Sequence, residues 1–109
     1  MNFGQMKDAM ALKARLGKME KELKKARISS DAQGGKVKIT VDGTGEVQSI
    51  EIDPELLSPD RRKDLEKGLA YAFNKAREAA GRFSQEKFKE LVDSLPPEMK
   101  AMLGGTFGS

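Results

Sequence analysis

The chain has 109 residues, contains neither Cys nor His, and carries a net charge of +3 at pH 7. These absences exclude disulfides, zinc sites of the usual kind, and catalysis by a Cys nucleophile or a His base. So short a chain buries a modest core, which favours an oligomer, most simply a twofold dimer. No apolar run reaches the roughly 20 residues that span a bilayer, and the N-terminus lacks a signal-peptide pattern, so we expect a cytoplasmic protein without a membrane partner.

Charge is unevenly distributed along the chain. Residues 1–28 carry eight Lys or Arg against three acidic residues, and residues 59–83 carry seven against four. Residues 34–58, which lie between them, carry two against five. Basic segments on both sides of an acidic one favour a polyanionic partner for the flanks.

Residues 2–26 read as one helix, because they lack Pro and are rich in Ala, Leu, Met, Lys and Glu. An apolar stripe with alternating spacings of four and three residues predicts a seam that meets another helix. This stripe comprises Leu12, Leu16, Met19, Leu23 and Ala26. Phe3, Met6 and Met10 lie on the far side of the helix from the seam. They form either a frayed end or a second apolar face that contacts a partner subunit.

Two strands and their turns are expected next. Residues 36–42 alternate strictly, with Val37, Ile39 and Val41 on one face, which predicts a half-buried strand. Turns are expected at residues 34–35 and 43–45, and residues 42–46 lack the spacing of a calcium loop. Residues 46–52 read as the returning strand, with a phase shift that indicates a bulge or a contact on both faces. Residues 27–33 are ambiguous when taken alone.

A second helical region follows two Pro-containing start signals. Asp53-Pro54 predicts a single turn capped by Asp53, and Ser58-Pro59 begins a long helix. Its apolar stripe comprises Leu65, Leu69, Ala72, Ala76, Ala79 and Phe83, widened by Phe73. Gly81 is expected to loosen the helix. An amphipathic pattern through Phe88, Leu91, Val92 and Leu95 extends it to Pro96-Pro97, after which we expect a mobile tail that contains at most one helical turn.

The outer face of each predicted helix, opposite its apolar stripe, carries basic or small residues and no acid. These residues are Lys7, Ala11, Ala14, Lys18, Lys21 and Lys25 on the first helix, and Lys63, Lys67, Ala70, Asn74, Arg77 and Gly81 on the second. A Lys-rich face often only keeps a helix soluble, and this alternative stays open. Small residues between cations would let a helix lie against a phosphate backbone. We therefore predict DNA contacts at Lys7, Lys18, Lys21, Lys25, Lys63, Lys67 and Arg77.

Base-specific readout is not indicated, because Trp is absent, the expected strands lack stacking aromatics, and no helix-turn-helix pattern is present. The predicted partner is duplex DNA, held through phosphates and shape. We predict no catalytic residues, metal site, cofactor or small-molecule substrate, and therefore no enzyme. The alternative function is a non-catalytic protein–protein adaptor that uses the amphipathic helices, with Phe3, Met6, Met10 and the pattern around Phe88 as its contacts.

Several segments together resemble the YbaB/EbfC nucleoid-associated proteins. These segments are residues 34–43, 50–57, 65–66, 72–76 and 95–97 followed by Lys100. The first helix, with its Met, Gln and Lys residues, is also similar in character. The resemblance covers most of the chain, and the ordered set at these spacings is more specific than any one segment.

The resemblance implies an α+β fold with the order α-β-β-β-α, a small antiparallel sheet and two long helices, so residues 27–33 would be the first strand. It implies one domain over residues 1–95, followed by the tail at 96–109. It also implies a homodimer joined through the sheet region, with helices projecting like tweezers. Such a dimer would bind duplex DNA with relaxed sequence preference at the nucleoid, with a role in nucleoid organisation, gene regulation or DNA repair. The family offers no catalytic residues to carry over.

Overall fold

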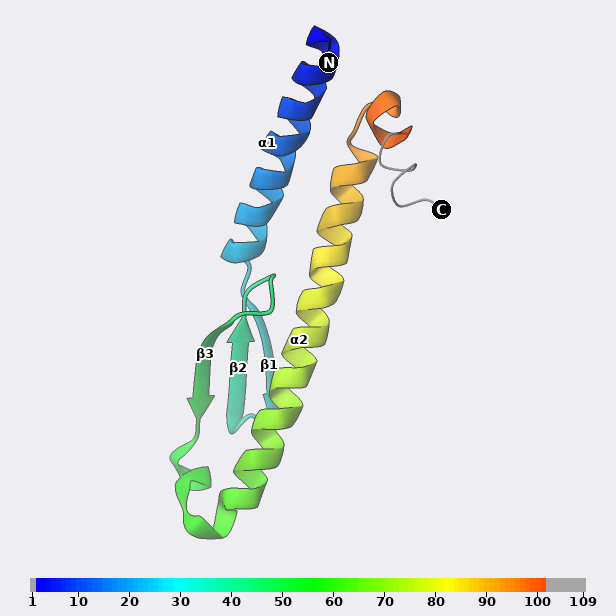
Figure 1. The fold of residues 1–109 in the computed structure, drawn as a ribbon. Helices are drawn as coiled ribbons and strands as arrows, with labels where there is room; N and C mark the ends of the chain where they lie inside the picture. Colours follow the sequence, from blue (N-terminus) through cyan, green and yellow to red (C-terminus); the bar gives the residue numbers. More distant parts are fainter. Residues whose placement is uncertain (1, 102–109) are drawn as a thin grey trace. The chain divides into compact units, whose positions relative to one another are not determined.

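The computed structural model of the protein describes residues 2–101 (Figure 1). Its elements follow the order α-β-β-β-α, with two short 3-10 turns before the last helix, which confirms the predicted α+β class. The elements are α1 (Phe3–Lys25), β1 (Ile28–Ala32), β2 (Val37–Val41), β3 (Val47–Ile52), η1 (Pro54–Leu57), η2 (Pro59–Arg61) and α2 (Arg62–Asp93). Two compact units contain them, one of residues 22–84 and one that joins residues 2–21 to residues 85–101.

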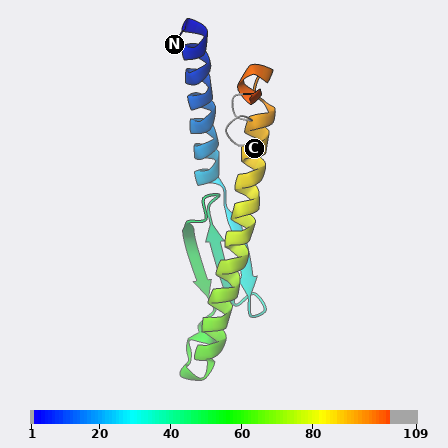
Figure 2. The same ribbon diagram turned by 45° about the vertical axis from the view of Figure 1, so that its right-hand side comes forward.

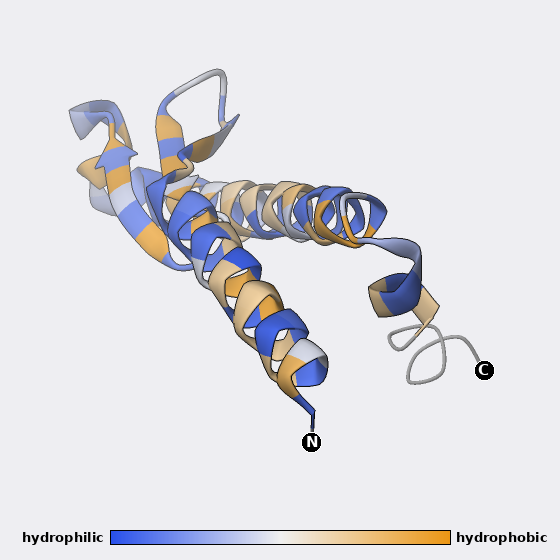
Figure 3. Cartoon of the chain, turned by 90° about the horizontal axis from the view of Figure 1, so that it is seen from above, coloured by the Kyte–Doolittle hydropathy of each residue, from blue (hydrophilic) through white to orange (hydrophobic). Residues whose placement is uncertain are grey.

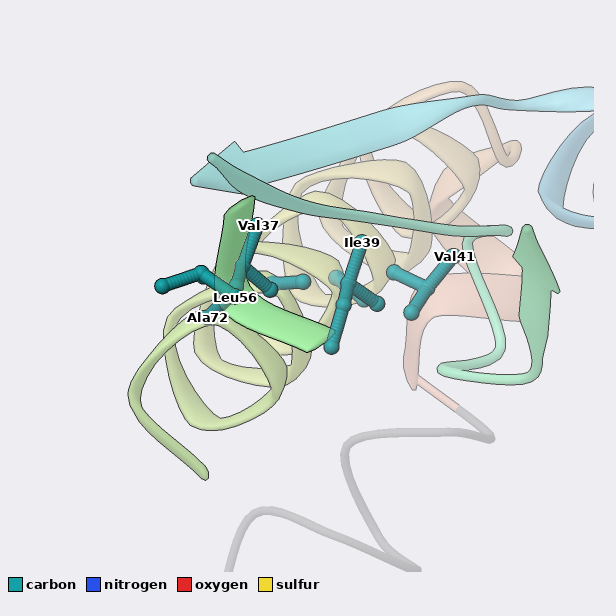
Figure 4. Packing of buried hydrophobic residues seen from close by; sticks show 7 residues of the cluster. Val37, Ile39, Val41, Leu56 and Ala72 are labelled. Atoms are coloured by element: carbon teal, nitrogen blue, oxygen red, sulfur yellow. The ribbon is translucent and has the colours of Figure 1, made fainter. Parts of the chain in front are cut away.

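The unit of residues 22–84 is a three-stranded antiparallel sheet packed against α2 (Figure 2). The strand order is β1-β2-β3, so β2 is central and pairs with both neighbours. Val37, Ile39 and Val41 lie on one face of β2 and project into the core beside Leu56 and Ala72 (Figure 4). Strict alternation along β2 therefore predicts the core correctly, because successive side chains of a strand point to opposite faces.

A bulge in β3 lies next to the turn that joins it to β2. Thr40 pairs with Ser49 and Val41 with Val47, so Gln48 is the extra residue. The Gln48 amide donates a hydrogen bond to the Asp42 carboxylate at 3.2 Å. The predicted bulge is thus confirmed, and it places a side chain where it stabilises the turn.

Asp42 holds the turn between β2 and β3. One carboxylate oxygen accepts from the Thr44 hydroxyl and from the amides of Thr44 and Glu46, at 2.8 and 3.1 Å for the two amides. The hydrogen bond from the Thr44 hydroxyl, helped by these amides and by the charge of Arg27, holds the pKa of Asp42 below its ordinary value of 3.8, although burial acts in the opposite direction. The segment at 42–46 is a turn, as its spacing predicts.

Replacing Asp42 by Asn should make the free energy of unfolding depend less on pH in the acidic range. Because the pKa of Asp42 is lower in the folded state, its carboxylate stabilises the fold above the unfolded value, and this stabilisation is lost as pH falls through the folded pKa. We expect the free energy of unfolding in urea, followed from about pH 7 to about pH 3, to fall less steeply for Asp42→Asn than for the wild type. Asp60→Asn is the matched control, and an unchanged slope for Asp42→Asn would contradict the prediction.

The first of the two predicted start signals forms a cap, whereas Ser58 makes no side-chain cap hydrogen bond and the α-helix begins only at Arg62, after a 3-10 turn. Asp53 caps η1 by accepting a hydrogen bond from the Glu55 amide at 2.8 Å. η2 then begins at Pro59, and α2 runs without interruption through Gly81 to Asp93. The expected loosening at Gly81 therefore leaves no break in the helix.

The predicted α2 stripe is only partly buried, and the structure adds Ala80 to its buried positions. Ala72 and Ala76 are buried as expected, but the next buried position is Ala80, while Ala79 is only half-buried. A strict alternation of four and three residues has a period of 3.5, whereas a straight helix has 3.6 residues per turn. The buried stripe therefore drifts by one position along a helix of 32 residues.

The second unit joins the first part of α1 to the end of α2 and the residues after it. Leu91, Leu95 and Met99 form a small buried cluster, against which Leu12 and Met19 of α1 pack. The Arg15 guanidinium donates to the Ser94 carbonyl and hydroxyl, at 3.3 and 2.8 Å. The predicted seam of α1 thus meets a helix.

The C-terminal segment is described only in part. Residues 97–101 are helical, and their Met99 side chain is buried. Residues 102–109 lie outside the described part of the chain, so the mobile tail over 96–109 stays a prediction, as does the single domain over 1–95.

Candidate nucleic-acid interface

All seven predicted DNA-contacting cations are exposed. Four lie on α1 and three on α2: Lys7, Lys18, Lys21, Lys25, Lys63, Lys67 and Arg77. Within residues 2–101 none of these seven forms an ion pair or a side-chain hydrogen bond. Other cations do have acidic partners, among them Lys36 with Glu55 at 2.9 Å and Arg62 with Glu66 at 2.7 Å. The predicted set is therefore electrostatically available to an external anion.

Two of these lysines border a shallow hollow on α1. This α1 hollow has a volume of about 600 Å³ and is lined by Met10, Lys13, Ala14, Gly17, Lys18 and Lys21. Ala14, Lys18 and Lys21 belong to the predicted outer face, whereas Lys7 and Lys25 do not line the hollow. Ala14 and Gly17 have the smallest side chains of the set, so the three lysines surround a low floor.

The hollow contains three residues that the sequence pattern does not select. These residues, Met10, Lys13 and Gly17, lie beside the predicted outer face of α1 and are not part of it. The sequence does contain a signal for Lys13. It is the neighbour of Ala14 of the outer face, and no acidic residue lies four positions before or after it that could form an ion pair with it on the helix. It forms no ion pair in the described chain, which makes it equivalent to Lys18 and Lys21 as a possible anion contact.

Gly17 has no structural requirement within the described chain. A Cβ atom at this position would meet nothing within 4 Å, and Gly17 is not among the residues with positive φ. Glycine in a helix interior costs about 1 kcal/mol relative to Ala. The position therefore lowers the floor of the hollow at some cost to helix stability.

Arg77 borders a different hollow, within the unit of residues 22–84. This α2 hollow, of about 360 Å³, is lined by Gly43, Thr44, Gly45, Phe73, Arg77, Ala80, Gly81 and Ser84. The amides of Thr44 and Gly45 already donate to Asp42, and that of Gly43 donates to the Leu23 carbonyl at 2.7 Å. Arg77 is therefore the charged group that this hollow offers to an anion, and Lys63 and Lys67 do not line it.

The described residues contain no cluster of three His, Cys, Asp or Glu side chains placed to hold a metal ion. Nor does any helix among them have the length and apolarity needed to cross a membrane. The charged side chains that line the two hollows are Lys and Arg, which bind anions.

Charge reversal at Lys13 should weaken DNA binding as much as charge reversal at Lys18, although only Lys18 belongs to the predicted outer face of α1. Each phosphate that the variant no longer neutralises should make the negative slope of log K against log salt less steep by about 0.9. Fluorescence anisotropy of Lys13→Glu and Lys18→Glu with one labelled duplex, across a salt series, measures this slope. A wild-type slope for Lys13→Glu would remove Lys13 from the interface.

Comparison with known sequences adds independent information about this chain. The sequence profile of the YbaB/EbfC DNA-binding family matches residues 1–95, which include all seven predicted cations. The chain belongs to the YbaB/EbfC DNA-binding family. The resemblance expected from the sequence segments is thereby confirmed.

Curated relatives agree with the YbaB/EbfC assignment. A nucleoid-associated protein of Rhodospirillum rubrum is 38% identical over 101 residues, which cover 90% of this chain and 94% of the relative. A nucleoid-associated protein of Dictyoglomus thermophilum is 35% identical over 94 residues, covering 86% and 90%. Neither the family description nor the names of these relatives denote an enzyme.

The fold of this YbaB/EbfC chain also occurs in a solved structure. The crystal structure of an uncharacterized protein from Helicobacter pylori superimposes with a TM-score of 0.74 and covers 84% of this chain and 98% of that chain. The two sequences are 22% identical in this comparison. The similarity therefore concerns the fold alone.

Proposed function

We propose that the protein binds duplex DNA as a homodimer with low or relaxed sequence specificity, through phosphate contacts from its basic helix faces. The observation that carries this proposal is the α1 hollow, in which three lysines without acidic partners surround a floor of Ala14 and Gly17. The contacting residues proposed are Lys7, Lys18, Lys21, Lys25, Lys63, Lys67 and Arg77, with Lys13 added from the geometry of the hollow.

The chemistry of these side chains supports binding without base readout. A lysine ammonium is a compact point charge on a flexible stem that contacts phosphate readily, whereas the rigid planar fork of Arg is the side chain pre-organised for bidentate recognition. Neutralising phosphates releases condensed counterions and stabilises the complex on any sequence. Low specificity follows from a surface in which lysine predominates.

Family membership supports a place at the nucleoid. The relatives in Rhodospirillum rubrum and Dictyoglomus thermophilum are named nucleoid-associated proteins. By analogy we propose that this protein associates with the nucleoid in the cytoplasm and acts in its organisation, in gene regulation or in DNA repair, without catalysing a reaction.

An uncovered part of the sheet supports the homodimer. Val47 and Ile50 of β3 are 38% and 52% exposed, although their cross-strand partners Val41 and Ile39 are buried. Paired residues of an antiparallel sheet share one face, so the apolar face of the sheet continues beyond the part that α2 covers. A second copy that packs on β3 would bury this surface and would also cover an edge strand. The tweezer-like arrangement of such a dimer stays a prediction.

The proposed function is tested by fluorescence anisotropy with two unrelated duplexes and one single strand, across a salt series, with the mass in solution measured alongside. We expect similar binding to both duplexes, a log–log salt slope of about −0.9 per phosphate contacted, and the mass of a dimer. A lack of duplex binding at low salt would contradict the DNA-binding proposal, and a monomeric mass would contradict the homodimer.

A further inference from the structure

The N-terminal part of α1 exposes an apolar stripe. Phe3, Met6 and Met10 are 82%, 51% and 71% exposed, and within residues 2–101 no other element covers them. Scattered apolar residues are ordinary on a protein surface, but here three large ones follow each other at helical spacing. The stripe therefore requires an explanation of its own.

This stripe continues directly into the α1 hollow. Spacings of three or four residues lead from Phe3 through Met6 and Met10 to Ala14 and Gly17, and Met10 itself lines the hollow. Apolar and polar bands alternate along α1 in Figure 3. One face of α1 therefore carries large apolar side chains at its N-terminal end and lysines around a low floor farther along.

Charge complementarity restricts what could occupy this face. Lys7, Lys13 and Lys18 lie on or beside it, whereas the acidic residues of α1 do not line the hollow. A matching partner must present anions next to an apolar crevice. The minor groove of duplex DNA does so, because two rows of phosphates border a groove about 6 Å wide, into which proteins insert Phe and Met as wedges between base steps.

The dimensions of α1 are compatible with simultaneous contacts. Met6 and Lys18 are separated by twelve positions, about 18 Å along a helix with a rise of 1.5 Å per residue. This length equals about five base-pair steps at 3.4 Å each. Apolar contacts in the groove and lysine contacts with phosphates can therefore belong to one binding site.

We propose that Phe3 and Met6 form a wedge that enters the minor groove and unstacks a base step, while the lysines of the α1 hollow hold the adjacent phosphates. The inference rests on the proposed function, since it assumes that duplex DNA is the partner. Its consequence is that the protein kinks the DNA that it binds. Pyrimidine–purine steps such as TA, which unstack most easily, would be the preferred points of insertion.

The test uses duplexes with 2-aminopurine at a central TA step and with a donor–acceptor dye pair at their ends. Binding of the wild type should raise the 2-aminopurine fluorescence and shorten the distance between the dyes. Phe3→Ala/Met6→Ala should lose both signals, although its affinity should change less than about tenfold, because the phosphate contacts remain. Phe3→Leu/Met6→Leu retains apolar bulk and should retain both signals. Leu57→Ala, at another exposed apolar position, is the matched control and should behave as the wild type.

Two results would overturn the wedge. In the first, the wild type binds duplex DNA but gives neither the rise in 2-aminopurine fluorescence nor the shorter distance between the dyes. In the second, Phe3→Ala/Met6→Ala still gives both signals. In the second case the mass in solution shows whether a second copy of the chain covers the apolar stripe instead. A lower mass for Phe3→Ala/Met6→Ala than for the wild type would mean that it does. Failure of the wild type to bind any duplex would instead contradict the proposed function itself. Circular dichroism of each variant checks that α1 is retained.

Discussion

Reversing the charges of Lys18 and Lys21 together should weaken duplex binding about 60-fold at about 0.1 M salt. Both side chains line the α1 hollow and have no acidic partner in the described chain. Two phosphate contacts contribute about 1.8 to the slope of log K against log salt, which amounts to about 1.8 log units between about 1 M and about 0.1 M salt. The substitutions should make the negative slope less steep and weaken the affinity, and each of these changes should be the same on two unrelated duplexes.

The control for this experiment makes the same change in net charge at two lysines outside the hollows. Lys89 and Lys100 are exposed and lie outside both hollows, so Lys89→Glu/Lys100→Glu alters the total charge equally. Anisotropy across a salt series should show nearly wild-type binding for this control. An equal loss in both double variants would mean that net charge, and not the α1 hollow, determines affinity.

The cations of the sheet region and those of the α1 hollow differ in their ion pairs. Residues 34–58 contain Lys36 and Lys38, and both form ion pairs across the unit of residues 22–84. The lysines of the α1 hollow have no such partners within the part of the chain that the structure describes. The sequence suggests this division through its charge blocks, but only the contacts establish which cations are free for a polyanion.

Much of the fold follows from local patterns in the sequence. Alternation along residues 36–42 identifies Val37, Ile39 and Val41 as core, because β2 is covered by α2 on one face. Asp53-Pro54 identifies the capped turn because the cap depends on neighbouring residues alone. Residues 27–33 stay ambiguous without the family resemblance, since β1 is an edge strand whose side chains are at most half-buried.

The features that local patterns miss depend on tertiary geometry. The hydrogen bonds around Asp42 involve Gln48, which reaches the turn only because a bulge displaces it. Lys13 and Gly17 are a different case, because all the residues that line the α1 hollow belong to one helix and a single row of basic residues leaves out the positions beside it. Burial of Met99 requires α1 and the end of α2 to meet, and helical periodicity gives no partner for either stripe.

Ile39→Ala should destabilise the protein by about 2–5 kcal/mol, a large fraction of the roughly 5–15 kcal/mol that stabilises a typical domain. Ile39 is only 2% exposed at the centre of β2, so the truncated side chain would leave a cavity between the sheet and α2. Urea denaturation measures this loss as a fall in the free energy of unfolding. A loss below about 1 kcal/mol would contradict the assignment of Ile39 to the core.

Ile50→Ala is the informative companion, because Ile50 is the cross-strand partner of Ile39 but is half exposed in one chain. In a monomer its truncation removes little buried surface, so the loss should be small and independent of protein concentration. If a second copy covers β3, the same substitution weakens the dimer, and the apparent stability then falls most at low protein concentration. A concentration series for Ile50→Ala, with Ile39→Ala as the core reference, thus separates the packing within one chain from the packing between two.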